Sequence, residues 1–312
     1  MITDVHAHLT SEEYLNCCRR DRLGGSHDAC YPGVLDPIDM NTRLAMMDAA
    51  GVQKQLLSPT CMPYSHDSQE AITAARLVNN QYAEIAKDNP ERFGFWASLP
   101  LPHVEASLAE IDRAFDELGA VGVALGCNCL EHSIADPAFE PIYHALNERG
   151  ATIFFHPCQT ALGSPAIYDW GLTICAGASM EDTVAALHLI NRAIPSRYPR
   201  LRFIFPHFGG PLAMLLDRLD GQMPRNELMV ESPKETAKRF YFDTVGWGSR
   251  AALLATVEAF GASQIVTGSD FPILLSVESY KQTFDHIRDS GLGDTLIGRI
   301  LENADRLLGE AR

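Results

Sequence analysis

The sequence predicts a (β/α)8 TIM barrel. Eight strand-like segments, each followed by a helix-like one, run through the 312 residues without a break in composition. The strand sequences VGVAL, TIFF, RFIF and QIVTG are apolar runs, as in parallel strands that are buried on both faces. A doubly wound sheet shows a similar alternation, but we favour the barrel. We expect residues 1–312 to form one barrel domain with a small insertion after the first strand and a C-terminal helix.

The individual elements follow from apolar patterns and from residues that start or end helices. The strands are expected at residues 2–6, 53–58, 93–99, 121–126, 152–156, 201–207, 240–244 and 264–269. The first helix, 11–20, has Ser11 as its N-cap and two glutamates in its first turn, and a glycine-rich loop follows it. The other helices are expected at 36–50, 69–88, 104–118, 137–149, 180–194, 211–219, 250–260, 277–290 and 296–308. Gly51, Gly119 and Gly150 end three of them.

Composition and charge narrow the classes of partner. The net charge of −15 and the pI near 5.1 argue against nucleic acid and anionic membranes. Apolar runs fall short of the roughly 18 to 20 residues that cross a bilayer, and the N-terminus lacks a basic and then apolar signal pattern. The eight cysteines fit no small secreted framework. We therefore expect a cytoplasmic protein with reduced thiols.

Residues that can bind a metal stand at the carboxyl ends of several predicted strands. His6 and His8 end the first strand, and both point to the same side because side chains alternate along a strand. Imidazoles spaced in this way make a natural first pair of ligands for a divalent metal. His156, His207 and Asp270 end the fifth, sixth and eighth strands. Catalytic groups of barrel enzymes lie at this rim, so the pattern predicts a metal site there.

Four motifs, in this order along the chain, resemble the amidohydrolase superfamily. They are Asp4-Val5-His6-Ala7-His8, Phe155-His156-Pro157, Pro206-His207-Phe208-Gly209-Gly210 and Gly268-Ser269-Asp270-Phe271-Pro272. More closely, the chain resembles the aminocarboxymuconate-semialdehyde decarboxylase branch, which includes 6-methylsalicylate, γ-resorcylate and 5-carboxyvanillate decarboxylases. Residues 43–58, 89–94, 240–244 and 303–304 extend the resemblance to nearly the whole chain. His-x-His in place of the Glu-x-His of γ-resorcylate-type enzymes moves the comparison towards the aminocarboxymuconate and methylsalicylate types.

The resemblance implies one divalent metal with four protein ligands and, beside it, His207 as an unligated base or acid. The implied ligands are His6, His8, His156 and Asp270. Three histidines and one carboxylate suit Zn²⁺ first, with Mn²⁺ or Fe²⁺ as alternatives. Binuclear members carry a carboxylated lysine at the end of strand four, and residues 121–126 contain no lysine, so one metal is expected. The Cys127 thiolate is a further candidate ligand, although we favour a packed or hydrogen-bonded thiol there.

Arg218 is the first candidate for binding substrate. It follows His207 by eleven residues, and the resemblance places at this spacing an arginine that reaches the substrate of a neighbouring subunit. This implies a homodimer. The alternative is an ion pair within its helix, with Asp217 or Asp220. The arginine that the family carries after strand one has here only three candidates, Arg19, Arg20 and Arg22, which we interpret as solvated helix charges.

Other candidates for the pocket lie near the ends of further strands. Trp170 and Trp247 follow strands five and seven, and Asn128 follows strand four. Trp96 lies within strand three. Aromatic rings at a barrel mouth suit a flat substrate, but they also occur as simple packing. Asn128 either hydrogen-bonds substrate or shapes a turn.

These patterns together predict a mononuclear metal-dependent, non-oxidative decarboxylase of a small unsaturated or hydroxy-aromatic carboxylate. In this reading the metal orients the carboxylate or an adjacent oxygen, and His207 or Asp270 moves the proton. The alternatives are a hydrolase of a small amide, ester or lactone, and a hydratase of the same branch. A barrel kept as a binding scaffold is disfavoured by its intact set of ligand positions.

Overall fold

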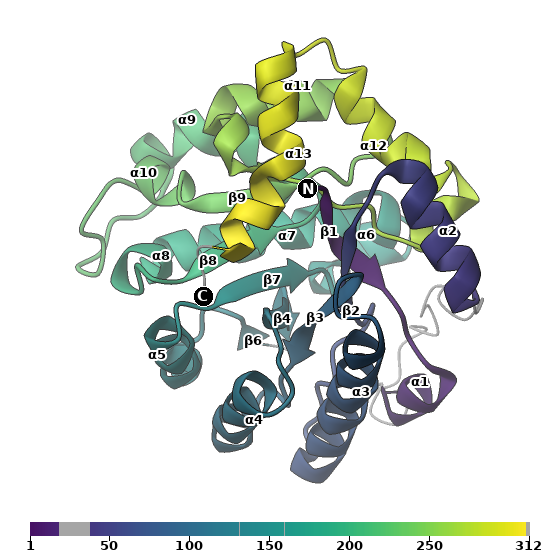
Figure 1. Ribbon diagram of the computed structural model, residues 1–312. Helices are drawn as coiled ribbons and strands as arrows, with labels where there is room; N and C mark the ends of the chain where they lie inside the picture. Colours follow the sequence, from purple (N-terminus) through teal and green to yellow (C-terminus); the bar gives the residue numbers. More distant parts are fainter. Residues whose placement is uncertain (19–37, 131, 159, 310–312) are drawn as a thin grey trace.

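The barrel is formed by eight parallel strands in one sheet. The computed structural model describes residues 1–18, 38–130, 132–158 and 160–309. The strand order is β1, β2, β3, β4, β7, β8, β9, β10, and helices surround the strands (Figure 1). The bounds are β1 Thr3–His8, β2 Lys54–Ser58, β3 Phe93–Ser98, β4 Gly122–Gly126, β7 Thr152–His156, β8 Arg202–Phe205, β9 Phe240–Asp243 and β10 Ile265–Val266. The predicted (β/α)8 barrel is confirmed.

Contacts between β1 and the region of β10 close the sheet. The Val5 amide donates to Thr267 O at 2.9 Å, and the His8 amide donates to Phe271 O at 2.6 Å. Ala7 and Phe271 form a parallel bridge beyond the short strand β10. The first and the last strand of the barrel are therefore neighbours, and the residues at their carboxyl ends share one rim.

Large apolar side chains fill the inside of the barrel. One buried cluster contains Val5, Leu56, Trp96, Ala124, Phe154, Ile204, Val266, Ala304 and Leu307. Trp96 is fully buried, stacks on Phe154 with ring centroids 5.9 Å apart, and donates from Nε1 to Val5 O at 2.8 Å. Of the two alternatives for Trp96, lining the pocket or simple packing, the structure shows packing in the barrel interior.

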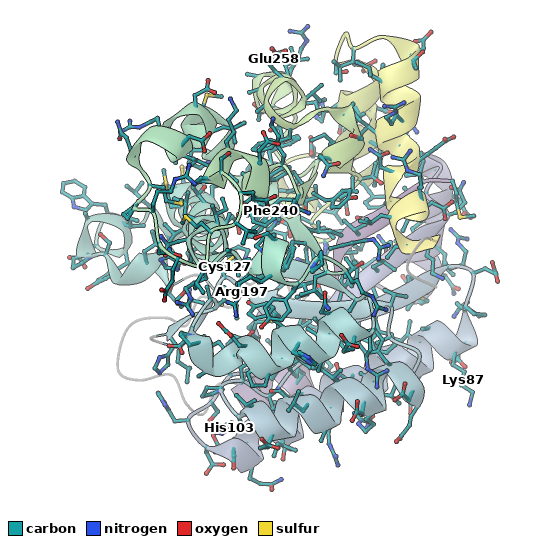
Figure 2. The ribbon with its side chains drawn as sticks, turned by 90° about the vertical axis from the view of Figure 1, so that its left-hand side faces the viewer. Lys87, His103, Cys127, Arg197, Phe240 and Glu258 are labelled. Carbon is teal, nitrogen blue, oxygen red and sulfur yellow. The ribbon has the colours of Figure 1, made fainter. Side chains whose placement is uncertain are left out.

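The helices follow the predicted alternation closely. They are α1 Glu12–Cys18, α2 Met40–Ala50, α3 Ser68–Asp88, α4 Val104–Asp116, α5 Glu140–Glu148, α7 Ala178–Asn191, α9 Leu212–Gln222, α11 Arg250–Phe260, α12 Tyr280–Arg288 and α13 Asp294–Gly309. Gly51 ends α2 with φ of +74°, a backbone conformation that glycine adopts without strain. Figure 2 shows Lys87 of α3 and Glu258 of α11 at the margin of the molecule and Phe240 of β9 nearer its centre.

Several short elements were not predicted. A small hairpin of β5, Asn128–Cys129, and β6, His132–Ser133, follows β4. Between β7 and α7 lie α6, Pro165–Tyr168, and a π-helical turn, Thr173–Gly177, and the short helices α8, Ile194–Arg197, and α10, Pro233–Ala237, come later. The expected insertion after strand one, with Arg19, Arg20 and Arg22, lies outside the described residues. Among the described helices, none combines the length and the apolar character that crossing a membrane requires.

Candidate metal centre

Three histidines and one aspartate converge at the carboxyl end of the barrel. The side chains of His6, His8, His156 and Asp270 are buried, and their ligand atoms all lie within 4.8 Å of one another. His6 Nε2 and His8 Nε2 are 3.1 Å apart, and they lie 3.3 and 3.0 Å from Asp270 Oδ1. Two atoms that bind one ion at about 2.1 Å are separated by about 3.0–3.4 Å when they subtend about 90–110° at it. The spacing of these three donor atoms therefore fits a single divalent cation, and His156 belongs to the same cluster.

Backbone carbonyls orient two of the histidine rings. His8 Nδ1 lies 3.0 Å from Ser58 O, and His156 Nδ1 lies 3.0 Å from Pro157 O. A carbonyl oxygen only accepts, so each Nδ1 carries the proton, and Nε2 is left with the lone pair that a metal needs. Both rings are thus held in the tautomer that ligates through Nε2.

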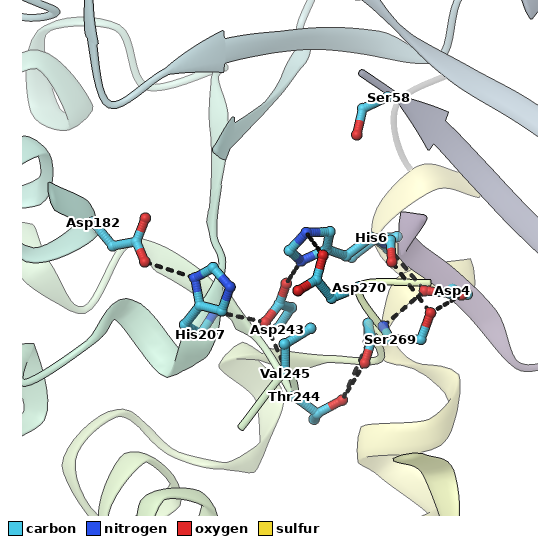
Figure 3. Close-up of polar contacts among 12 residues, drawn as sticks. Asp4, His6, Ser58, Asp182, His207, Asp243, Thr244, Val245, Ser269 and Asp270 are labelled. Atoms are coloured by element: carbon cyan, nitrogen blue, oxygen red, sulfur yellow. Dashed lines mark hydrogen bonds and ion pairs between the residues drawn. The ribbon is translucent and has the colours of Figure 1, made fainter. Parts of the chain in front are cut away.

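Asp243, at the end of β9, links the third histidine to His207. Its Oδ2 lies 2.6 Å from His6 Nδ1, so it fixes the tautomer of His6. Its Oδ1 accepts the backbone amides of His207 at 2.8 Å and Val245 at 3.0 Å. The carboxylate therefore holds a ligand ring and the main chain of His207 together (Figure 3).

The charges within the cluster match those of a cation site. Burial raises the pKa of Asp270, but His6 and His8 outweigh it and hold that pKa well below its usual range. Burial lowers the pKa of His6, yet Asp243 and Asp270 prevail and raise it to about 10. Burial lowers the pKa of His8 and, more strongly, that of His156. Two carboxylates thus face one imidazole, and a bound cation would offset their negative charge.

His207 lies beside the four ligands without belonging to them. Its ring centroid is 5.6 Å from that of His6, and its Nδ1 is 2.8 Å from Asp182 Oδ2. The Cys127 thiol donates to the other oxygen of Asp182 at 3.2 Å. Burial lowers the pKa of His207, but the charge and hydrogen bond of Asp182 raise it above its ordinary value. Cys127 is thus a hydrogen-bonded thiol, the alternative that we favoured from the sequence.

Both His207 and Asp270 have a strained backbone. Their φ values are +53° and +55°, in the left-handed region that side chains with a Cβ rarely adopt. Such residues cost of the order of 1–3 kcal/mol each and persist where their surroundings impose them. For Asp270, the surroundings include a bond from its own amide to His6 O at 2.8 Å, and Ser269 before it donates to Asp4 Oδ2 at 2.6 Å. Strain at these two positions is typical of functional residues.

The candidate substrate-binding residues lie outside this cluster. Arg218 is exposed on α9 and donates to Gln222 Oε1 at 2.8 Å, whereas Asp217 pairs with Lys234. Trp170 is 79% exposed and Trp247 is 56% exposed. Asn128 donates to Thr160 Oγ1 at 3.0 Å, and its buried Oδ1 has no partner among the described residues. These contacts do not connect the four residues to the metal centre.

The sequence reasoning missed Asp243 and Asp182. A signal for Asp243 was present, since it ends strand seven just as Asp270 follows strand eight. Asp182 lies inside α7, where nothing in the local sequence separates it from a surface carboxylate. Only the packing of α7 on the barrel brings it to His207.

Comparisons with known proteins agree with this geometry. A model of the family described as "Amidohydrolase" matches residues 3–309. The 6-methylsalicylic acid decarboxylase of Penicillium expansum is 32% identical in an alignment of 284 positions that covers 86% of this chain and 84% of that protein. The 2-amino-3-carboxymuconate-6-semialdehyde decarboxylase of Dictyostelium discoideum is 26% identical in an alignment of 320 positions that covers 93% of this chain and 89% of that protein. A dihydroxybenzoic acid decarboxylase from Polaromonas sp., crystallised with manganese and an inhibitor, has a TM-score of 0.84 at 22% identity and covers 100% of this chain and 97% of its own.

Proposed function

The chain belongs to the amidohydrolase family, in its branch of metal-dependent decarboxylases, and from that premise we propose that it is a mononuclear carboxy-lyase. Its substrate is a small hydroxy-aromatic or unsaturated carboxylate, and the reaction releases carbon dioxide without oxidation. The observation that carries the proposal is His207, held beside a buried set of three histidines and one aspartate. The names of the relatives support decarboxylation over hydrolysis or hydration.

In this proposal, four residues bind the metal and His207 transfers the proton. His6, His8, His156 and Asp270 would hold one divalent cation, which would act as a Lewis acid on an oxygen of the substrate. His207 gives a proton to the carbon that bears the carboxylate. The bond from this carbon to the carboxylate then breaks, its electron pair returns to the π-system, and carbon dioxide leaves. Asp270 is the second candidate for moving this proton, because it lies in the same cluster.

We propose Zn²⁺ as the cation and Mn²⁺ as the alternative. Three imidazole nitrogens and one carboxylate suit zinc, whereas a site rich in oxygen ligands suits manganese better. The structural relative from Polaromonas supports manganese, since it was crystallised with that metal. Metal analysis of the purified protein, followed by stripping and reloading with each ion, decides between the two by the turnover that each restores.

We also propose a homodimer in which Arg218 reaches the partner's substrate. Met214 lies one turn before Arg218 on α9 and is 68% exposed, so this face offers apolar surface for a second copy to cover. Trp170, Trp247 and Asn128 remain candidates for contacts with the substrate. We place this single-domain enzyme in the cytoplasm, because its eight cysteines fit no small secreted disulfide framework. Sedimentation of active protein as a monomer would contradict the dimer.

The deciding experiment is carbon dioxide release by metal-assayed protein. The panel holds ortho-hydroxybenzoates, with 6-methylsalicylate among them, and muconate-type acids. We expect release from at least one compound, loss of release with retained metal in His207→Asn, and loss of both in Asp270→Ala. If protein with one metal bound releases no carbon dioxide from any compound of the panel, decarboxylation is refuted and the hydrolysis of esters, lactones or amides is favoured. An active His207→Asn protein would remove His207 from the reaction.

A further inference from the structure

A chain of three hydrogen-bonded side chains ends at His207, and its first two members, Cys127 and Asp182, are buried. The Cys127 thiol, just after β4, donates to Asp182 Oδ1 at 3.2 Å, and Asp182 Oδ2 lies 2.8 Å from His207 Nδ1. Asp182 is 0% exposed and Cys127 is 4% exposed. Figure 3 shows Asp182 on the side of His207 that faces away from His6 and Asp270. The three groups come from three different parts of the barrel, so only the finished fold assembles them.

This arrangement fixes which nitrogen of His207 is free. A carboxylate accepts hydrogen bonds, so the proton between Asp182 and His207 lies on Nδ1, and Nε2 is the atom left for chemistry. The second carboxylate oxygen is occupied by the thiol, and Asp182 therefore cannot turn away without losing both bonds. The backbone amide of His207 is held separately, by Asp243.

Asp182 is not needed to dock the loop that carries His207 on α7, because neighbouring residues already do so. Thr183, the next residue of α7, donates from Oγ1 to Gly209 O at 2.9 Å and so ties the helix to the loop that carries His207. Gly210 packs so closely that a Cβ there would come 2.1 Å from Ser179 O. The loop is thus already docked on α7 by other residues, and the bond from Asp182 reaches only the imidazole ring.

We propose that Asp182 is the positioning residue of His207, holding the Nδ1 proton so that Nε2 exchanges the proton of the reaction. This inference rests on the proposed function in that it assigns proton transfer to His207. It is nevertheless a statement about one ring, and it can be measured without any substrate.

The first readout is the protonation of the His207 ring nitrogens. Zinc-loaded protein labelled with ¹⁵N in histidine is compared as wild type, Asp182→Asn and Asp182→Ala, and the resonances of His207 are identified by their loss in His207→Asn. We expect Nδ1 to carry a proton in the wild type. In Asp182→Ala it has no carboxylate partner, and the ring shifts to the Nε2–H tautomer that free histidine prefers.

The second readout is turnover with whichever compound the panel identifies. General acid or base catalysis contributes about 10²–10⁴-fold, and replacing the orienting aspartate of a serine protease triad with asparagine lowers kcat about 10⁴-fold. We therefore expect kcat to fall at least about 100-fold in Asp182→Ala, with KM and metal content near those of the wild type. Asp217→Asn, which removes an exposed carboxylate paired with Lys234, is the matched control and should leave kcat unchanged.

Three results would overturn the assignment. The first is a His207 ring in Asp182→Ala that keeps its proton on Nδ1, and the second is a kcat of this variant within about twofold of the wild type. The third is a loss of metal in proportion to the loss of kcat, since Asp182 would then support the ligands and not His207. If no compound is decarboxylated, the ¹⁵N spectra still decide the role of Asp182, so the two proposals fail separately.

Discussion

Replacing Asp243 with asparagine tests how the candidate metal ligand His6 is oriented. Asp243 accepts three hydrogen bonds, from His6 Nδ1 at 2.6 Å and from the backbone amides of His207 and Val245 at 2.8 and 3.0 Å. Asparagine keeps the shape of aspartate but has one accepting oxygen and one donating NH2 group. The amide therefore serves either the two backbone amides or His6, and cannot serve both as the carboxylate does.

The two orientations of the amide differ in cost. If its oxygen faces His6, two buried backbone amides lose their acceptor, at about 1–3 kcal/mol each and about 2–6 kcal/mol together. If its oxygen keeps the backbone amides, the NH2 group faces His6 Nδ1, and the ring must place its proton on Nε2. Loss of such an orienting partner lowers metal affinity about 10–100-fold, which is about 1.4–2.8 kcal/mol. The second orientation costs less, so the damage falls on metal binding and the fold remains.

The assay is a competition between protein and a chelator of known affinity for Zn²⁺, with circular dichroism to confirm the fold. We expect Asp243→Asn to bind Zn²⁺ about 10–100-fold more weakly than the wild type. The exposed change Asp217→Asn serves as the control. An Asp243→Asn protein with unaltered zinc affinity would refute the reasoning, because His6 would then ligate without its carboxylate partner. Unfolding of this variant would show instead that the amide oxygen has turned to His6 and left the two backbone amides without their acceptor.

Three further outcomes follow from packing and burial. Phe154→Ala empties a fully buried site beside Trp96 and should cost about 3–5 kcal/mol in the free energy of unfolding, measured by urea denaturation. Gly126→Ala places a Cβ 2.4 Å from Cys158 Sγ and should lower the melting temperature. An unchanged melting temperature would show that the loop around Cys158 moves aside at little cost in free energy. Burial raises the pKa of Cys158 to about 12, so at pH 8 a thiol reagent should label the exposed Cys175 long before it labels Cys158, as mass spectrometry can follow.

The order of strands and helices could be predicted because it is a local property of the chain. The helix at Arg250–Phe260 has the same bounds in the structure as in the prediction, since Ser249 caps its start and Gly261 ends it. The segment between β7 and α7 was not predicted as helical. Its α6 and π-helical turn are short, and glycines at 163 and 171 interrupt the periodic pattern on which prediction depends.

The five site residues at the strand ends could be predicted from the sequence because barrel geometry brings the ends of parallel strands to one rim. His6, His8, His156, His207 and Asp270 do lie together, as expected. The hydrogen-bond partners that orient these five residues could not be predicted in the same way. Ser58 contributes a backbone carbonyl, which its side chain does not reveal, and Asp182 lies in a helix whose facing residues are known only after folding.

The closure of the barrel has a consequence for the order in which a newly made chain acquires its metal. His8 and Asp270 meet at the carboxyl end of the barrel although 262 positions separate them, and the bridge from Ala7 to Phe271 forms beside them. When only the first 200 residues have been synthesised, three of the four candidate ligands are present. Asp270 and the last strand, β10, are still missing. The proposed metal site therefore has all four of its ligands only in a chain whose synthesis has passed Asp270.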